Sequence, residues 1–252
     1  MDIAVLGCGP AGLLVADAVE RAGHKPHIYS RKEKSVIPGS QHLQGYIPGI
    51  TPDYPDSAVM FVRMGTKEGY AEKVYGDPYH ECGWPNYDGV FKSWSVFKAY
   101  DKLWEKWEGE IVDHEINAIT LQNLIEAYAT IFSTIPQPSL CHGRHNFDGI
   151  PYWIKPSITP RADQHREVVV FNGLPDDHWY RWSILGGKES LESTAPLNYS
   201  HEGRKAISND CDCWPEIHRL GRWAKWQHGV LLHHAYAEAL TLVAEEGAKV
   251  GN

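Results

Sequence analysis

The chain has 252 residues, of which 42% are hydrophobic and 22% charged, and its formal net charge is −8. This length and composition allow a buried core and fit one large domain or two small ones. The basic residues are spread along the chain instead of clustered, which argues against nonspecific binding of a nucleic acid backbone.

The sequence also bears on where the protein works. It contains no apolar run long enough to span a membrane and no signal-peptide pattern. Its five cysteines are scattered and odd in number, so they form no disulfide framework and fit a reducing compartment. We therefore predict a cytoplasmic protein without a membrane partner, whose oligomeric state does not follow from the sequence.

The first thirty residues predict a strand, a helix and a second strand. Residues 2–6 are apolar and read as a buried strand, a glycine-rich turn follows, and residues 13–22 have a helical pattern. Gly23 stands where helices commonly end, and residues 26–30 resume an extended run. This order is typical of a βαβ unit with a parallel sheet.

The glycine-rich turn has the spacing Gly7-x-Gly9-x-x-Gly12. In such a turn the first glycine permits the tight bend, the second lets the backbone approach a pyrophosphate, and the third lets the helix pack on the strand. The unpaired amides and the dipole at the helix N-terminus favour an anion there. The sequence therefore predicts dinucleotide binding, with contacts from Gly7, Gly9, Pro10, Ala11 and Gly12.

The kind of dinucleotide depends on the end of the second strand, where an acidic residue commonly binds the ribose hydroxyls. Ser30, Arg31 and Lys32 stand there instead, a pattern that suits the 2′-phosphate of NADP. A solvated turn is an equally good interpretation, and Glu33 could serve if the strand runs longer. Ser30 and Arg31 are cofactor-binding candidates, and the dinucleotide stays open at this point.

The rest of the chain alternates between strand and helix patterns after a Pro- and Gly-rich stretch at 36–56, which we expect near the ligand. Strands are predicted at 58–64, 70–75, 130–135, 152–154, 167–171 and 179–185, and helices at 96–107, 121–129 and 230–244. These elements predict an α/β fold: a Rossmann-like dinucleotide-binding domain with a parallel sheet, and a small antiparallel-sheet substrate domain.

The predicted division of the chain is discontinuous. The dinucleotide-binding domain comprises residues 1–56, 97–149 and 205–252, and the substrate domain comprises 57–96 and 150–204.

Four segments, in chain order, carry a family resemblance. The glycine-rich unit is the first, and residues 131–136 look like a late strand that ends in a Thr-x-Pro turn near a cofactor. Residues 172–181 look like a strand where an Asn and an aromatic-Arg pair approach a flavin, and residues 220–224 look like a Gly-Arg turn along a flavin. Together they resemble the glutathione-reductase-like class of FAD proteins, within it the branch of amine oxidases, protoporphyrinogen oxidases and UDP-galactopyranose mutases.

The chain also resembles short oxidoreductase-like proteins of actinobacterial viruses, which would place it in the cytoplasm of a host cell. The class resemblance implies FAD as the cofactor, and the pattern of Ser30, Arg31 and Lys32 leaves NADP as an alternative or co-substrate. It also implies an FAD-dependent oxidoreductase acting on a small molecule, with a nucleotide-linked substrate as the narrower expectation. The further cofactor contacts that we expect come from Gln41, Thr134, Gly221, Arg222 and Trp223.

Three residues are candidates for catalysis. His42 is a candidate general acid or base, because only histidine titrates near neutrality when unperturbed. Arg181 could bind a substrate phosphate or carboxylate with its planar fork, or could instead form a cross-strand ion pair. Its neighbour Tyr180 is the third candidate.

Two other functions remain open. The match at residues 172–181 favours a mutase-like isomerase in which reduced flavin attacks a sugar nucleotide. The missing acidic residue favours an NADP-binding or flavin-binding protein without catalysis.

Cysteines and histidines raise the question of a metal. The sequence has two groups of zinc-type donors: Cys211, Cys213 and His218, and Cys141, His142 and His145. The Cys-x-Cys spacing is narrower than that of common zinc knuckles, so we predict no bound metal.

Overall fold

The computed structural model describes residues 1–39, 41–55, 57–86, 88–156 and 167–250. The chain forms two compact units, each built from separate segments. The first unit comprises Met1–Val36, Tyr100–Asp148 and Ser208–Asn252, and the second comprises Ile37–Ala99 and Gly149–Ile207. The sequence-based division kept residues 37–56 with the dinucleotide-binding part, whereas in the structure they cluster with the second unit.

The first unit contains a five-stranded parallel sheet with the order β13-β7-β1-β2-β6. Its central strand is β1 (Asp2–Leu6), whose last four side chains are fully buried. Leu6 lies opposite Tyr29 of β2 and Ser133 of β7, so the carboxyl ends of these strands meet at one edge. The other strands are β2 (Lys25–Ser30), β6 (Ile111–Asp113), β7 (Thr130–Ser133) and β13 (His218–Arg219).

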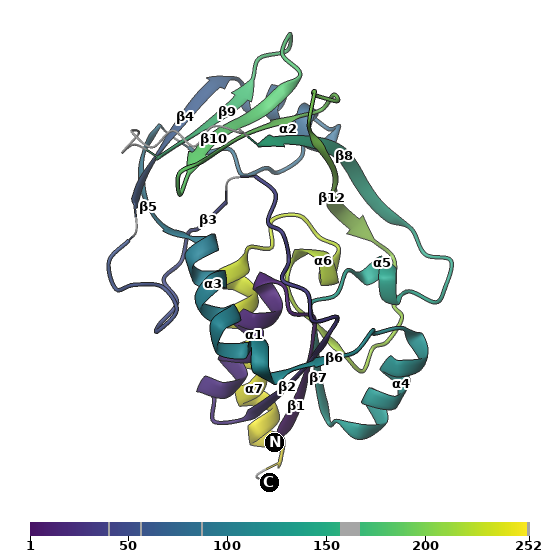
Figure 1. Cartoon of the computed structure of the whole chain (residues 1–252). Coiled ribbons are helices and arrows are strands. Elements are labelled where there is room, and N and C mark those ends of the chain that lie inside the picture. The colour runs from purple at the N-terminus through teal and green to yellow at the C-terminus, as the bar shows by residue number, and fades with distance from the viewer. Residues whose placement is uncertain (40, 56, 87, 157–166, 251–252) are drawn as a thin grey trace. The chain divides into compact units, whose positions relative to one another are not determined.

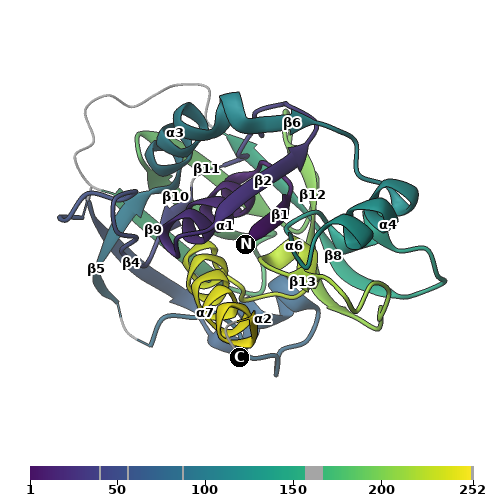
Figure 2. The same ribbon diagram turned by 90° about the horizontal axis from the view of Figure 1, so that it is seen from below.

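Helices cover both faces of this sheet. The apolar helix α1 (Pro10–Arg21) packs against α7 (Leu232–Val250) on one face, and α4 (Ala118–Ala127) covers the other (Figures 1 and 2). Helix α3 has the predicted bounds, Val96–Trp107. The short helices are η1 (Glu108–Glu110), α5 (Gln137–Leu140) and α6 (Arg222–Lys225). No helix in the described part of the chain is long and apolar enough to cross a membrane.

The second unit contains an eight-stranded sheet with the order β12-β8-β11-β10-β9-β4-β5-β3. Strand β4 (Ser57–Gly65) runs parallel to β9 (Glu167–Gly173) and antiparallel to β5 (Gly89–Ser95). The sheet is therefore mixed, not antiparallel as predicted, because β4 and β9 belong to distant chain segments. The remaining strands are β3 (His42–Leu43), β8 (Phe147–Pro156), β10 (Trp179–Leu185), β11 (Lys188–Ser193) and β12 (His201–Asn209).

One predicted strand is a helix. Residues 70–75 lie in α2 (Lys67–Tyr75), and the prediction of a strand there was wrong. The side chain of Thr66 accepts a hydrogen bond from the Gly69 amide (3.0 Å) and so caps the start of the helix, while Gly76, at φ 69°, ends it. These two caps outweigh the alternating apolar pattern, and β5, which the sequence analysis missed, pairs with β4 instead.

Candidate functional site

The carboxyl edge of the parallel sheet in the first unit gathers most of the predicted cofactor residues. The glycine loop follows β1, Ser30 ends β2, Thr134 follows β7, and the Gly221–Arg222 turn follows β13. In open α/β sheets, ligands bind outside the carboxyl ends of the strands where the connections diverge. The space between β1 and β7 is such a point, because the chain proceeds from β1 to β2 on the opposite side.

The three glycines of the loop have different roles. Gly7 has φ +102°, and a Cβ there would lie 2.6 Å from Thr134 Oγ1. A Cβ at Gly12 would lie 2.0 Å from the Gly7 carbonyl oxygen. A Cβ at Gly9 would meet nothing closer than Ser35 Oγ at 3.5 Å, which is an ordinary contact. Gly7 and Gly12 are thus required by the loop itself, whereas Gly9 leaves a face that the protein does not fill.

The start of α1 offers free amides beside this face. The first hydrogen bond of the helix runs from the Leu13 amide to the Gly9 carbonyl (3.1 Å), so the Ala11 and Gly12 amides precede it. Pro10 stands at the first helical position, where its missing N–H costs nothing. Within this described helix the first turn has no acidic residue and no side-chain cap. The helix end is therefore arranged for an anion.

The segment that contains β13 and the Gly221–Arg222 turn also reaches the glycine loop. His218 pairs with Phe132 of β7, and the Leu220 amide donates to the Ser133 carbonyl (2.9 Å). Gly221 follows at φ +84°, and a Cβ there would lie 3.3 Å from Ala11 Cβ. The turn that carries Arg222 therefore lies beside the glycine loop.

Two more predicted residues lie at this edge. Trp223, the second residue of α6, is 39% exposed. The Thr134 hydroxyl donates to the Leu6 carbonyl (2.9 Å) beneath the glycine loop, so it positions the loop.

The segment after β2 folds back onto the glycine loop. The thiol of Cys8 lies 3.5 Å from the carbonyl oxygens of both Arg31 and Glu33. The Tyr100 hydroxyl donates to the Cys8 carbonyl (3.0 Å) and accepts from the Ser35 amide (3.0 Å). Burial raises the pKa of Tyr100, which keeps this donor protonated.

The residues predicted to contact the ribose lie in this segment. Because β2 ends at Ser30, Glu33 is not part of a longer strand, and Arg31 and Lys32 are exposed. Ser35 and Tyr100 were missed by the sequence analysis. Tyr100 is indistinguishable in sequence from a core residue of its helix, and Ser35 lies in a stretch without regular periodicity.

The remaining candidates belong to the second unit. The Gln41 side-chain amide donates to the Pro38 carbonyl (3.4 Å). His42, in β3, lies with its ring 5.8 Å from that of Phe61. Burial, together with the charge of Arg181, lowers the pKa of His42 to about 4. His42 is therefore neutral at pH 7, and the premise that it titrates near neutrality does not hold.

Arg181 forms the cross-strand ion pair that was its alternative interpretation. Its guanidinium contacts Glu192 of β11, which is 4% exposed. Burial by itself would raise the pKa of Glu192, but the charges of Arg181 and Lys205 outweigh it and hold that pKa below its ordinary value. The pair is thus ionised inside the sheet.

Tyr180 lies in the aromatic core of the second unit and is 1% exposed. Trp179 pairs with Ser193 and Arg181 with Glu192, so Tyr180 is the extra residue of a β-bulge. Burial and the nearby charge of Glu192 raise the pKa of Tyr180 well above its ordinary value. This hydroxyl therefore keeps its proton at neutral pH.

Asn172, which carried the mutase-like match, closes the turn between β9 and β10. Its amide donates to Asp177 (2.8 Å) and to the Trp179 carbonyl (3.1 Å), and its oxygen accepts from the Leu174 amide (2.9 Å). The whole amide group is used within the turn.

Solved structures with a similar fold are known, although family models and curated proteins give no match. Among solved structures, 2-methyl-3-hydroxypyridine-5-carboxylic acid oxygenase matches with a TM-score of 0.55 and 12% identity, over 96% of this chain and 81% of the other. CtdE in complex with FAD matches with a TM-score of 0.54 and 9% identity, over 97% and 84%. A variant of HpxO from Klebsiella pneumoniae in complex with FAD matches with a TM-score of 0.53 and 10% identity, over 97% and 80%.

The chain therefore shares the α/β fold of these oxygenase and FAD-bound structures, with a parallel sheet in one unit and a mixed sheet in the other. The predicted fold class is confirmed. At 9–12% identity the likeness shows the fold alone, and it supports neither the amine oxidase and mutase branch nor the resemblance to viral proteins.

Proposed function

We propose that this protein is an FAD-dependent oxidoreductase of the monooxygenase type that acts on a small organic molecule. The observation that carries the proposal is the placement of Gly221 beside Ala11, which brings the late Gly-Arg turn to the glycine loop. A protein that only binds a nicotinamide dinucleotide has no need of that late segment. The fold of the solved FAD-containing structures supports the same proposal.

The residues at the edge of the sheet fit FAD. The Ala11 and Gly12 amides and the open face of Gly9 would hold the pyrophosphate. Arg222 would add positive charge beside it, and Ser30 and Ser35 would supply hydroxyls toward the adenosine ribose in place of the missing carboxylate. When bound, the flavin supplies the electron transfer, so the protein has to hold the ring, orient the substrate and exclude side reactions.

The substrate class is the less defined part of the proposal. The matched oxygenase is named for a small ring-bearing carboxylic acid, and another matched structure is a tetracycline destructase (TM-score 0.53, 10% identity). We propose a small ring-bearing organic substrate by analogy with these names. A nucleotide-linked substrate has no support from them.

The first test is the absorption spectrum of the freshly purified protein, followed by acid release and chromatography of the bound molecule. We expect a flavin spectrum and released FAD. A colourless protein that neither takes up added FAD nor is stabilised by it would remove the proposal.

The second test separates binding from folding at Gly9. Gly9→Ala adds a methyl group where only an ordinary contact with Ser35 is made, so the free energy of unfolding of the cofactor-free protein should not change. The methyl group occupies the face that the pyrophosphate approaches, so we expect FAD affinity to fall about tenfold or more, or 1.4 kcal/mol. Gly247→Ala in α7, where a Cβ meets nothing within 4 Å, is the matched control and should bind FAD normally.

One alternative keeps a specific observation in its favour. Arg31 and Lys32 are exposed after β2, as expected for binding the 2′-phosphate of NADP, either as a co-substrate or in a protein without catalysis. If Arg31→Ala with Lys32→Ala weakens NADPH binding and leaves FAD binding unchanged, the co-substrate role is supported. The mutase alternative has lost its motif, because the Asn172 amide is used within its turn.

A further inference from the structure

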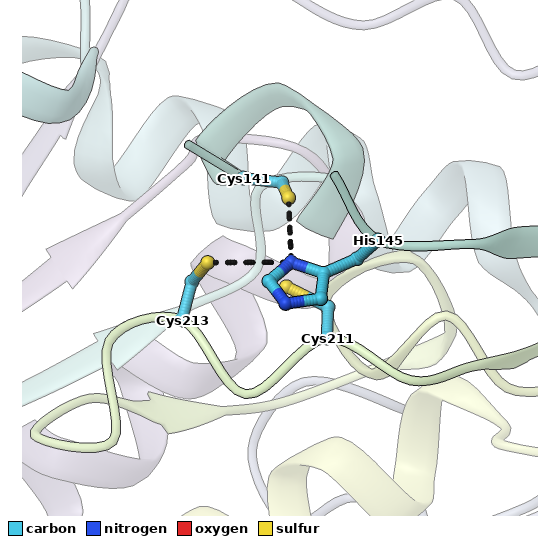
Figure 3. Close-up of side chains that lie close together, drawn as sticks. All are labelled: Cys141, His145, Cys211 and Cys213. Carbon is cyan, nitrogen blue, oxygen red and sulfur yellow. Dashed lines mark hydrogen bonds between the residues drawn. The ribbon is translucent and has the colours of Figure 1, made fainter. Parts of the chain in front are cut away.

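Two loops of the first unit bring together four zinc-type donors. Cys141 follows α5, His145 lies just before β8, and Cys211 and Cys213 lie between β12 and β13. Their ligand atoms all lie within 4.8 Å of one another (Figure 3). Cys213 is buried, and the other two cysteines are half-buried.

The distances fit a tetrahedral ion. Zinc binds thiolate sulfur at about 2.3 Å and imidazole nitrogen at about 2.0 Å, so a tetrahedron has S···N edges of about 3.5 Å and S···S edges of about 3.8 Å. His145 Nδ1 lies 3.2 Å from Cys141 Sγ and 3.6 Å from Cys213 Sγ. Small movements of side chains would therefore place all four atoms around one ion.

Two of the thiols lie beside the same ring nitrogen. Cys141 Sγ and Cys213 Sγ lie 3.2 and 3.6 Å from His145 Nδ1, and Cys141 Sγ also lies 3.4 Å from the Gly143 carbonyl oxygen, a second acceptor for its hydrogen. The other ring nitrogen, Nε2, lies 3.3 Å from the carboxylate of the exposed Asp212. A histidine that binds zinc through one nitrogen commonly donates the other N–H to a carboxylate, so Asp212 orients the ring for binding through Nδ1.

The two loops are held together around the cluster by other contacts. The Gln137 side chain donates to the Cys211 carbonyl (2.9 Å), and the Trp214 indole donates to the Leu140 carbonyl (2.7 Å). On the other side, the Asn146 amide donates to the Asp210 carboxylate (2.7 Å). A Cβ at Gly143 would lie 2.5 Å from the His145 ring, so the loop leaves room for this ring and no more. The donor positions are thus fixed by their surroundings.

We infer that Cys141, His145, Cys211 and Cys213 form a structural zinc site that cross-links the two loops. All four positions are filled by protein atoms, which is the arrangement of structural and not of catalytic zinc. The expectation of no metal considered each donor group along the sequence alone. The structure combines two of the three donors of each group and leaves out His142, whose ring packs on Trp214, and His218, which pairs in β13.

The test measures metal in the full-length protein, purified without a metal-chelating column. Elemental analysis should find about one zinc per chain, and Co²⁺ exchanged into the site should give the visible bands of a tetrahedral thiolate complex. Removing zinc with a chelator should lower Tm by about 5 °C or more, with recovery on adding Zn²⁺. These readouts do not depend on FAD or on activity.

Variants identify the ligands. Cys141→Ser and His145→Ala should lose zinc, whereas His145→Cys keeps a donor and should retain it. Cys82→Ser, which removes a half-buried thiol in the second unit, is the matched control and should keep zinc. If Cys141→Ser does not fold, the comparison of His145→Ala with His145→Cys and the Co²⁺ spectrum of the wild-type protein still test the inference.

Three results would overturn the inference. They are a purified chain that holds no zinc and takes up none, a zinc content that is unchanged in Cys141→Ser and His145→Ala, or a peptide map that shows two of the three cysteines joined as a disulfide.

Discussion

The first unit exposes backbone groups at one edge of its sheet, whereas the second unit buries charged side chains within its own. At the edge of the first unit, the glycine loop offers amides and open space, and the phosphate site that we propose there depends on the absence of side chains. In the second unit, Arg181 and Glu192 form an ionised pair beside an aromatic core. We therefore expect that substitutions in the first unit can change ligand binding and the free energy of unfolding independently. Substitutions in the second unit should not separate these two quantities.

The largest effect should come from breaking the buried pair. Arg181→Ala leaves Glu192 buried without its main partner, and we expect a loss of about 3–5 kcal/mol in the free energy of unfolding, measured with urea. Arg63→Ala is the control, since its pair with Asp88 is partly exposed and should contribute about 1 kcal/mol or less. Adding Glu192→Gln to Arg181→Ala should restore part of the loss. A fully stable Arg181→Ala protein would show that the fold does not depend on this guanidinium.

The second effect comes from comparing substitutions at two glycines of the same loop, Gly12 and Gly9. Gly12→Ala places a Cβ 2.0 Å from the Gly7 carbonyl oxygen, so the loop or the helix must shift. We expect thermal or urea unfolding of the cofactor-free protein to show a loss of about 1–3 kcal/mol. Gly9→Ala should instead change stability by less than about 0.5 kcal/mol. Equal losses in the two variants would contradict the separation of binding from stability.

The smallest effect concerns pH. The pKa of His42 is about 4 in the folded protein and 6.5 in the unfolded chain, so between these values the unfolded chain binds more protons. Stability should therefore be complete above pH 6.5 and fall as the pH is lowered toward 4, by about 1 kcal/mol between pH 7 and pH 5. Urea unfolding of wild type and His42→Gln at the two pH values tests this, and the variant should lose about that much less on acidification. An identical pH dependence in both proteins would show that a group other than His42 causes the loss of stability.

Local signals explain what the sequence could predict. The βαβ unit at residues 2–30 contains its own strand, turn and helix signals within a short stretch, and α3 has the predicted bounds because its apolar periodicity is strong. The prediction of a strand at 70–75 was wrong because it relied on the apolar alternation and did not take account of Thr66 and Gly76, the residues that cap α2.

Contacts between distant segments explain what it could not predict. The parallel pairing of β4 with β9 has no local signature, nor does the junction of two cysteine-containing loops. The late Gly-Arg turn could be placed by resemblance alone, since nothing in residues 220–224 specifies Ala11 as a neighbour. Ser35 and Tyr100 were missed for the same reason.

The meeting of Gly221 with Ala11 also has a consequence for how the protein is made. The glycine loop leaves the ribosome early, but a nascent chain that ends before Ser208 lacks β13, α7 and the turn beside the loop. Contacts between such distant segments form slowly, because a long loop must close before they are made. The cofactor site that we propose would therefore be completed late in folding, and a flavin that binds there would stabilise only chains that have finished assembling the first unit.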